Sequence, residues 1–287
     1  MRYGRHTAVS PPSRAVKNAL RFSRPPARVL GSVAGKAEKL AEGRVFQQPA
    51  SGPRFEVGLA RDTADVVAAQ RLRYRVFVEE LGARLPHLKH RLDRDRFDPY
   101  CDHLLVRDAD TGAVVGTYRM LPGVEAHKLG GFWSEEEFDL GDVGRLPGLV
   151  EVGRACVDPA YRTGAVLGLL WAGLARYLID GGYEHAIGCA SIPAREERST
   201  AQATCRRLVV DHLGPPEWRV APRTPFGLDD VPPAAPADLP ALVRGYLRLG
   251  ASVCGEPAWD PDFGTADLLI LLPLAALDVR WARRLLR

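Results

Sequence analysis

The sequence has no apolar run that approaches the roughly 18 residues needed to cross a membrane. The longest candidate, LLILLPLAAL at 268–277, is short and contains Pro273, so we expect it to form a buried strand or an interfacial segment. The opening residues, MRYGRHTAVSPPSRAVKNAL, lack a continuous apolar core and a small-residue cleavage site, which argues against a secretory signal. These absences predict a cytoplasmic protein.

Paired cysteines are also missing. The sequence has five scattered cysteines and no CxxC pair, which is typical of a reducing compartment where thiols serve as small buried side chains. The acidic stretch DRDRFDPYCDH does not fit a calcium loop, because the required glycine is absent and Phe97 interrupts it. We therefore expect no metal site and no bound cofactor.

Charge is unevenly distributed. Residues 1–50 contain ten Lys and Arg but two Asp and Glu, although the net charge of the whole chain is only +4. This predicts a basic, partly disordered arm over 1–52, followed by one domain over 53–287. Such an arm suits an anionic partner such as a membrane surface or an acidic protein, and the alternative is a solvated extension. Nucleic acid is not expected, because aromatic residues do not interleave with the basic ones.

Alternating and helical apolar patterns predict an α/β fold with a mixed, mostly antiparallel sheet flanked by helices. The expected strands are 55–60, 103–108, 113–121, 149–157, 185–192 and 266–273, and the expected helices are 62–81, 163–180, 195–213 and 240–250. DADTG between the second and third strands indicates a hairpin. No internal repeat is visible.

The turn YRTGAV precedes the second of these helices. Backbone N–H groups at a helix start have no intrahelical acceptor and can bind an anion. Gly164 permits close approach, Thr163 can cap the helix, Arg162 adds a cation, and Ala165 begins the helix. The turn is a candidate phosphate site, although many ordinary helices begin in a similar way.

A glutamate lies in the apolar strand LVEVGRACV. Burying an unpaired Glu151 is costly, so it should either pair with Arg154 or Arg119, or act as a base with a raised pKa. Strand alternation places Glu151 and Arg154 on opposite faces unless a bulge intervenes. From the residues alone, the structural and the catalytic interpretations stand about equal.

The acidic segment before 103 has two interpretations as well. Asp95 and Asp98 could form a solvated acidic loop, or they could bind the ammonium groups of an amine substrate. Arg73 and Phe77 lie four residues apart, on one face of the first helix.

Several long segments resemble one family, the L-ornithine N-acyltransferases of the GNAT superfamily. They are LRYRVFVEELGA, FDPYCDHLLV, VVGTYRMLPG, GGFWSEEEFDL, EVGRACVDPAYRTGAVLGLLWAGLARYL, IGCASIP and GYLRLGASVCGEPAWDPDFGTADLLILLP. The resemblance covers roughly residues 55–275. It implies a GNAT-like fold and the transfer of a 3-hydroxyacyl group from acyl carrier protein to the α-amine of ornithine, giving lyso-ornithine lipid.

The same family is similar to the acyl-homoserine lactone synthases. Their ordered pattern is matched here in all seven positions, and it implies an amine and acyl pocket formed by Arg73, Phe77, Asp95, Asp98, Arg119, Glu151 and Arg154. The RTGAV–LLW segment has no close equivalent in those synthases, which favours the ornithine branch.

The resemblance implies a mechanism without a covalent enzyme intermediate. Glu151 would take the proton of the amine, Arg119 or Arg154 would hold the α-carboxylate, and Asp95 with Asp98 would hold the distal ammonium. Phosphopantetheine would lie on residues 162–165, and the amphiphilic product suggests peripheral membrane contact. The alternatives are acylation of another amine, an acetyl-CoA donor, or a non-catalytic domain that binds acyl carrier protein or lipid.

Overall fold

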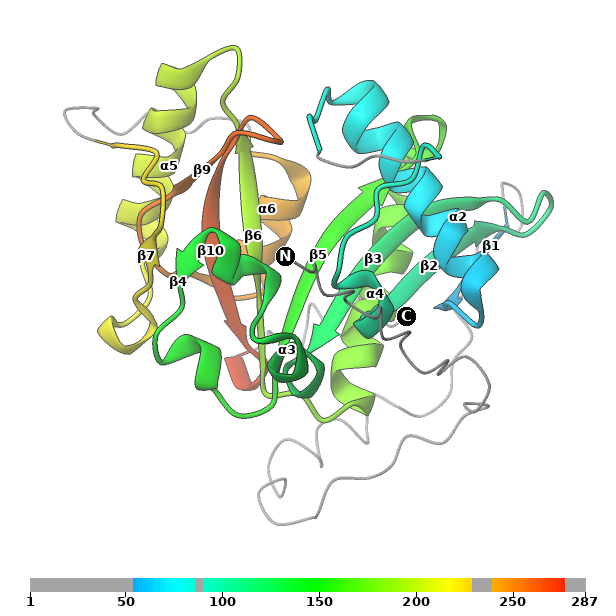
Figure 1. Ribbon diagram of the computed structural model, residues 1–287, viewed down its shortest axis with the longest axis horizontal. Helices are drawn as coiled ribbons and strands as arrows, with labels where there is room; N and C mark the ends of the chain where they lie inside the picture. Colours follow the sequence, from blue (N-terminus) through cyan, green and yellow to red (C-terminus); the bar gives the residue numbers. More distant parts are fainter. Residues whose placement is uncertain (1–53, 86–89, 229–238, 277–287) are drawn as a thin grey trace, which may run out of the picture.

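The computed structural model describes residues 54–85, 90–228 and 239–276, arranged around one main sheet (Figure 1). The expected arm at 1–52 and the basic tail VRWARRLLR at 279–287 lie outside these ranges. The strands are β1 (Phe55–Leu59), β2 (Asp102–Asp108), β3 (Val114–Pro122), β4 (Phe138–Asp139), β5 (Leu149–Val157), β6 (His185–Pro193), β7 (Ala221–Pro222), β8 (Ser252–Val253), β9 (Ala258–Asp260) and β10 (Thr265–Pro273). The helices are α2 (Thr63–Arg73), α3 (Gly123–Leu129), α4 (Ala165–Asp180), α5 (Arg198–His212) and α6 (Ala241–Arg248). None of the helices in this part of the chain is long and apolar enough to cross a bilayer.

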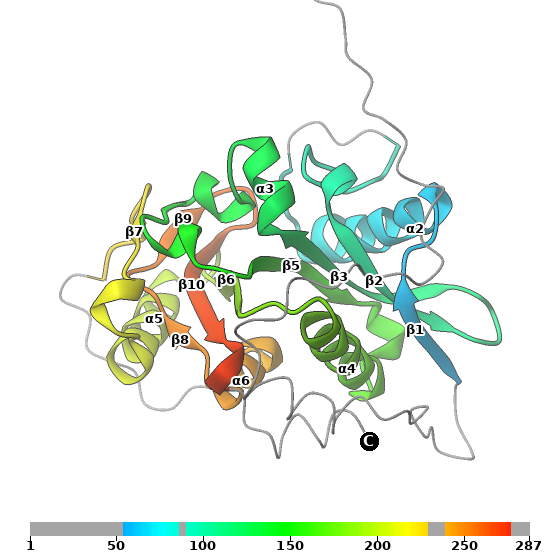
Figure 2. The ribbon, with the colours of Figure 1, turned by 90° about the horizontal axis from the view of Figure 1, so that it is seen from below.

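The main sheet has the strand order β1-β2-β3-β5-β6-β10-β8, and β9 also pairs with β10. Its neighbouring strands are antiparallel except for β5 and β6, which are parallel. Helices α2 and α3 cover one face, and α4, α5 and α6 cover the other (Figure 2). The expected mixed, mostly antiparallel α/β fold is confirmed.

Local sequence signals explain most element boundaries. The Asp62 side chain caps α2 by accepting the N–H of Asp65, and the helix continues through π-helical turns over Tyr74–Glu80 before Gly82 ends it at φ 69°. One expectation was wrong. Thr163 does not cap α4, because the N-cap position is Gly164, at φ 90°, and no side chain caps this helix start.

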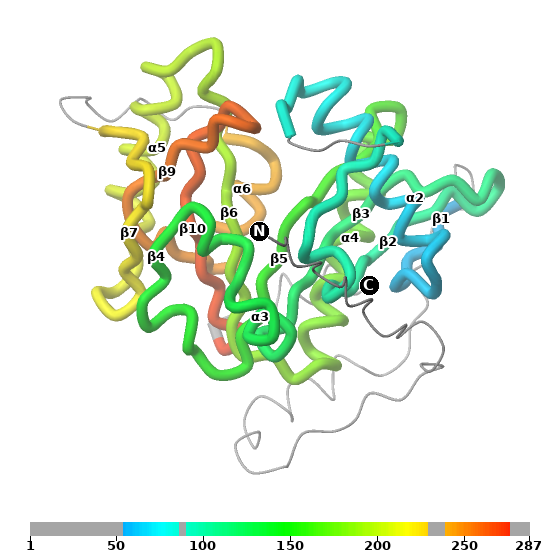
Figure 3. Tube along the Cα trace, in the orientation of Figure 1, coloured from blue at the N-terminus to red at the C-terminus, as the bar shows by residue number. Residues whose placement is uncertain are grey.

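The sequence patterns did not predict α3 or the short strands β4, β7, β8 and β9. The chain between α3 and β4 runs across the sheet toward β10 (Figure 3). Phe132 of this segment packs in one apolar cluster with Phe138 of β4, with Leu140, and with Leu269 and Leu271 of β10. This segment therefore covers part of the sheet that no helix of that face covers.

The central sheet opens between its two parallel strands. β5 and β6 pair only at Leu149–Glu151 with His185–Ile187, and beyond Glu151 the strands diverge (Figure 1). On its other edge β5 contains a bulge, because Gly153 pairs with Arg119 and Cys156 with Thr117. Two residues of β5 thus lie opposite one residue of β3. The first of them, Arg154, has φ 51°, an uncommon conformation for a residue with a side chain.

Candidate active site

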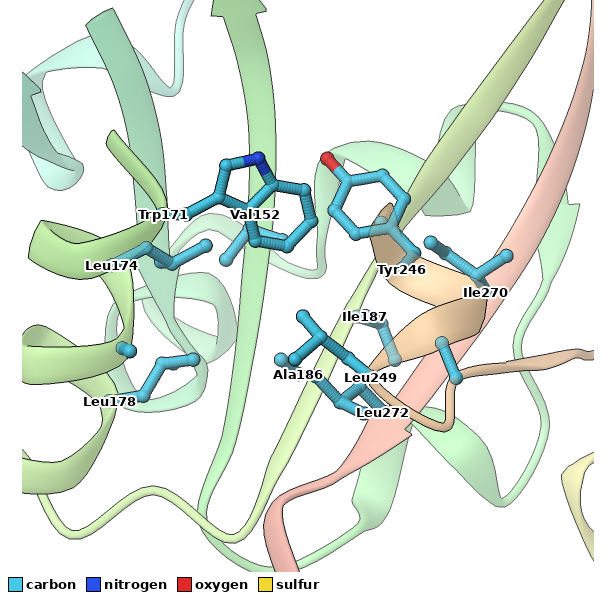
Figure 4. A pocket seen from close by; sticks show the side chains of 13 residues that line it. Val152, Trp171, Leu174, Leu178, Ala186, Ile187, Tyr246, Leu249, Ile270 and Leu272 are labelled. Atoms are coloured by element: carbon cyan, nitrogen blue, oxygen red, sulfur yellow. The ribbon is translucent and has the colours of Figure 1, made fainter. Parts of the chain in front are cut away.

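An apolar cavity lies where the sheet opens, on the face covered by α4 and α6 (Figure 4). Val152 and Gly188, which directly follow the last paired positions, belong to its lining. The rest of the lining is Trp171, Leu174, Ala175, Leu178, Ala186, Ile187, Tyr246, Leu249, Ala251, Ile270 and Leu272. Trp171 and Tyr246 meet with ring centroids 5.1 Å apart, and the Tyr246 hydroxyl is hydrogen-bonded to that of Tyr118. The cavity suits an apolar chain.

Glu151 lies at the same opening but points to the other face, since side chains alternate along a strand. Its carboxylate accepts hydrogen bonds from the backbone N–H groups of Trp133 (2.7 Å) and Ser134 (2.8 Å). Burial raises the pKa of Glu151, while the two amide contacts oppose that change. Neither arginine expected from the sequence forms an ion pair with it among the described residues, so backbone amides replace the predicted partner.

The bulge turns Arg154 toward the same side as Glu151. Its guanidinium lies between two aromatic rings, 4.8 Å from the centroid of Trp133 and 4.9 Å from that of Phe263. Phe77 packs edge-on against Phe263, with centroids 5.5 Å apart. Phe77 thus supports the ring that holds Arg154, a relation that its spacing from Arg73 does not reveal.

Three arginines and three aspartates form a closed, alternating arrangement that we call the arginine ring. Each aspartate contacts two arginines, and each arginine contacts two aspartates. Arg73 bonds Asp93 (3.0 Å) and Asp98 (2.7 Å), Arg119 bonds Asp98 (3.1 Å) and Asp95 (2.6 Å), and Arg154 lies 3.8 Å from Asp95 and 3.5 Å from Asp93. Five of the residues singled out from the sequence therefore meet in one network.

The arginine ring balances its own charges. Burial opposes ionisation, yet the charges of Arg73 and Arg119 lower the pKa of Asp98, and Arg119 lowers that of Asp95. Asp95 is its most exposed aspartate, with 23% of the side chain accessible. Because Asp95 and Asp98 are already paired with arginines, their contacts do not match the predicted role of binding a substrate ammonium.

A second set of carboxylates, which we call the acidic cluster, consists of Glu137, Asp260 and Asp267. Burial and repulsion from Asp267 and Asp260 raise the pKa of Glu137 to about 9. Burial likewise raises the pKa of Asp267 to about 6 and raises that of Asp260. None of the ion pairs between the described residues joins a lysine or arginine to these three groups. The charge of Arg154 lowers their pKa values, but its ion pairs are with Asp93 and Asp95 of the arginine ring.

The turn before α4 follows the open end of β5. Gly164 has open space where a side chain would begin, and the first amides of α4 have no side-chain acceptor. Arg162 is already engaged, since its guanidinium forms a two-pronged ion pair with Glu80 at 2.6 and 2.7 Å. The anion-binding capacity of this turn therefore lies mainly in its backbone.

Sequence reasoning missed the acidic cluster. Asp267 interrupts the apolar strand TADLLILLP in the same way that Glu151 interrupts LVEVGRACV, so a carboxylate within an apolar strand was the available signal. Glu137 and Asp260 gave no comparable signal, because each lies in a short segment with a mixed pattern.

A sheet opened between two central strands, with an apolar cavity at the opening and an uncapped helix after it, defines an acyltransferase of the GNAT class. A family model described as "Acetyltransferase (GNAT) domain" matches residues 72–172. A solved structure of a CoA-dependent acyl-homoserine lactone synthase, BjaI, shares the fold with a TM-score of 0.50 at 17% identity, covering 79% of this chain and 87% of that one.

Two relatives named "L-ornithine N(alpha)-acyltransferase" match most of the chain. The protein from Rhizobium meliloti is 39% identical, with 79% of this chain and 82% of that protein covered. The protein from Rhodobacter capsulatus is 38% identical, with 78% and 92% covered. The chain belongs to the L-ornithine N(alpha)-acyltransferase family, which confirms the resemblance seen in its motifs.

Proposed function

We propose that this protein transfers a 3-hydroxy fatty acyl group from acyl carrier protein to the α-amine of L-ornithine, giving lyso-ornithine lipid. The names of the relatives support ornithine as the acceptor. The single observation that carries the proposal is the opening of the sheet at Glu151, with an apolar cavity on one face and buried charged groups on the other.

The donor occupies the side of α4. The acyl chain fills the cavity beside Trp171 and Tyr246, where it replaces water with apolar contacts. The phosphate of phosphopantetheine binds the first backbone amides of α4 at residues 163–165, and Arg162 exchanges its partner Glu80 for this phosphate. No cofactor of the enzyme's own takes part, because the acyl group arrives already activated as a thioester.

The acceptor occupies the opposite face. Its α-amine attacks the thioester carbonyl, the C–S bond breaks, and the sulfur leaves as the thiol after gaining a proton. Glu151 takes the proton that the amine loses, and its raised pKa suits that task. Backbone N–H groups of β5 beyond the last pair stabilise the oxyanion. Arg154 holds the α-carboxylate, because its contacts with Asp93 (3.5 Å) and Asp95 (3.8 Å) are the longest in the arginine ring and can be exchanged for the substrate, whereas Arg119 stays bound to Asp95.

An amine panel tests this function. The purified protein is incubated with 3-hydroxyacyl thioesters of acyl carrier protein and with several amino acids, and the products are read by mass spectrometry. We expect N-acylated ornithine as the main product. If another amine is preferred, or acetyl-CoA is the better donor, the proposal is wrong.

The role of Glu151 is tested by Glu151→Gln. We expect kcat/KM to fall about 10²- to 10⁴-fold, with loss of the acidic limb of its pH profile. A role limited to holding Trp133 and Ser134 would lower the rate equally at every pH. Glu56→Gln, an exposed change on β1, is the matched control.

A further inference from the structure

A polar pocket lies beside the acidic cluster, on the same side of the sheet as Glu151. Glu137 and Asp260 form part of its lining, together with Trp133 and Trp259. Asp267 lies next to Glu137, because the ligand atoms of Glu137, Asp267 and Cys189 are all within 4.8 Å of one another. The inner wall of this pocket therefore carries closely spaced acidic groups.

Two carboxylate oxygens of the acidic cluster have no well-formed hydrogen bond, although the Cys189 thiol faces Glu137 and the Thr265 hydroxyl faces Asp267. Asp267 is only 2% exposed, and its Oδ2 accepts a hydrogen bond from Ser191 at 3.1 Å. Its Oδ1 and the Oε2 of Glu137 are buried and have no hydrogen-bond partner among the described residues. Buried carboxylate oxygens are normally satisfied, so such a pair is the feature expected where a ligand supplies the donors.

We propose that the acidic cluster binds the side-chain ammonium of the amino acid substrate and so selects diamino acids. An ammonium group offers three N–H donors for the oxygens of Glu137 and Asp267 with the neighbouring Asp260, and its positive charge favours release of the proton that Glu137 keeps in the unliganded protein. Trp133 and Trp259, which also line the pocket, offer apolar surface to the methylene chain. This inference rests on the proposed function, since it assigns a subsite within the same active site.

Trp133 connects this pocket to the reacting centre. Its backbone N–H donates to Glu151, its ring lies against the guanidinium of Arg154, and it lines the pocket. One amino acid can therefore place its ammonium in the acidic cluster and its carboxylate at Arg154, with its α-amine toward Glu151.

A divalent metal is the competing ligand. Glu137, Asp267 and Cys189 offer one ligand atom each. Structural zinc sites usually have four protein ligands, and magnesium prefers oxygen ligands alone, so this mixed set of three fits neither well. An ammonium group fits because it needs only acceptors.

Binding measurements test the inference without any acyl donor. Ornithine and norvaline, which lacks the side-chain amine, are titrated calorimetrically into the full-length protein and into Glu137→Gln and Asp267→Asn. We expect both variants to bind ornithine about 10- to 100-fold more weakly and norvaline with unchanged affinity. Glu136→Gln is the matched control, because Glu136 lines the same pocket but is paired with Arg96.

Each outcome decides one proposal. Equal losses for ornithine and norvaline, or no loss in Glu137→Gln, overturn the ammonium site even if ornithine is acylated. Zinc or magnesium binding that disappears in Glu137→Gln while ornithine binding persists would identify a metal site instead. If ornithine shows the expected binding pattern but is not acylated, the subsite stands and the proposed function fails. Circular dichroism verifies that each variant folds. If Asp267→Asn does not fold, Glu137→Gln still provides the test, because Glu137 is partly accessible and its substitution disturbs the core less.

Discussion

The arginine ring and the acidic cluster both contain buried carboxylates, yet their electrostatics are opposite. In the ring, arginines lower the pKa values of Asp95 and Asp98 despite burial. In the cluster, burial without an ion-paired cation raises the pKa values of Glu137 and Asp267. A buried carboxylate that is paired with arginines therefore belongs to the framework, whereas one without an ion-paired cation remains available to a ligand.

Breaking the ring should have the largest effect. Arg73→Met removes a fully buried guanidinium and leaves Asp93 and Asp98 short of positive charge, so we expect the free energy of unfolding to fall by about 3–5 kcal/mol. Urea denaturation measures this change. Arg54→Met, which removes an exposed pair with Asp110, should cause no measurable loss. Equal effects of the two substitutions would contradict a structural role for the ring.

Neutralising Glu137 in the acidic cluster should change the free energy of unfolding by less than Arg73→Met does, and in the opposite direction. The raised pKa of Glu137 means that the folded state keeps a proton that the unfolded state has released, so the stability of the protein falls as pH rises from the ordinary glutamate pKa toward about 9. Glu137→Gln removes this dependence. We expect it to match the parent protein at about pH 5 and to be the more stable of the two at about pH 8.

Thermal unfolding across this pH range measures the difference. Asp267, Asp260 and Cys189 are the titratable groups that face Glu137, and Arg154 is the cation whose charge lowers its pKa. Glu136→Gln, the control, should change the thermal stability by the same amount at every pH. A Glu137→Gln variant that is less stable at every pH would show that Glu137 is a structural residue.

The smallest effect is expected at the turn before α4. Since Arg162 is 45% accessible and already paired with Glu80, we expect Arg162→Ala to raise the KM for the acyl carrier protein thioester only about two- to fivefold, with kcat unchanged. Steady-state kinetics measure this, with Arg75→Ala, which loses a similar exposed pair with Asp158, as the control. A large fall in kcat would place Arg162 in the chemical step.

Much of the fold could be predicted from local patterns. The capping aspartate of α2, the hairpin of β2 and β3, and the apolar strands β5, β6 and β10 all follow from residues close together in the chain. α3 and the short strands could not be predicted, because their apolar residues are too few for a period and they pack against segments that are distant in the sequence.

The candidate site was predicted only in part. Five of the seven residues singled out from the sequence meet in the arginine ring. Their pairing was not predicted, because Asp93 completes the ring and Trp133 and Ser134 take the carboxylate of Glu151. Those contacts join segments that are far apart in the sequence.

The sequence by itself determined the order of the long strands and of the helices other than α3, the family and the residue types available for acyl transfer, since periodicity and motifs are properties of neighbouring residues. Only the tertiary structure decided which carboxylates are neutralised, where the sheet opens and which acids remain without a cation. Those outcomes depend on distances between segments brought together by folding, and the energy of a buried charge changes sharply over such distances.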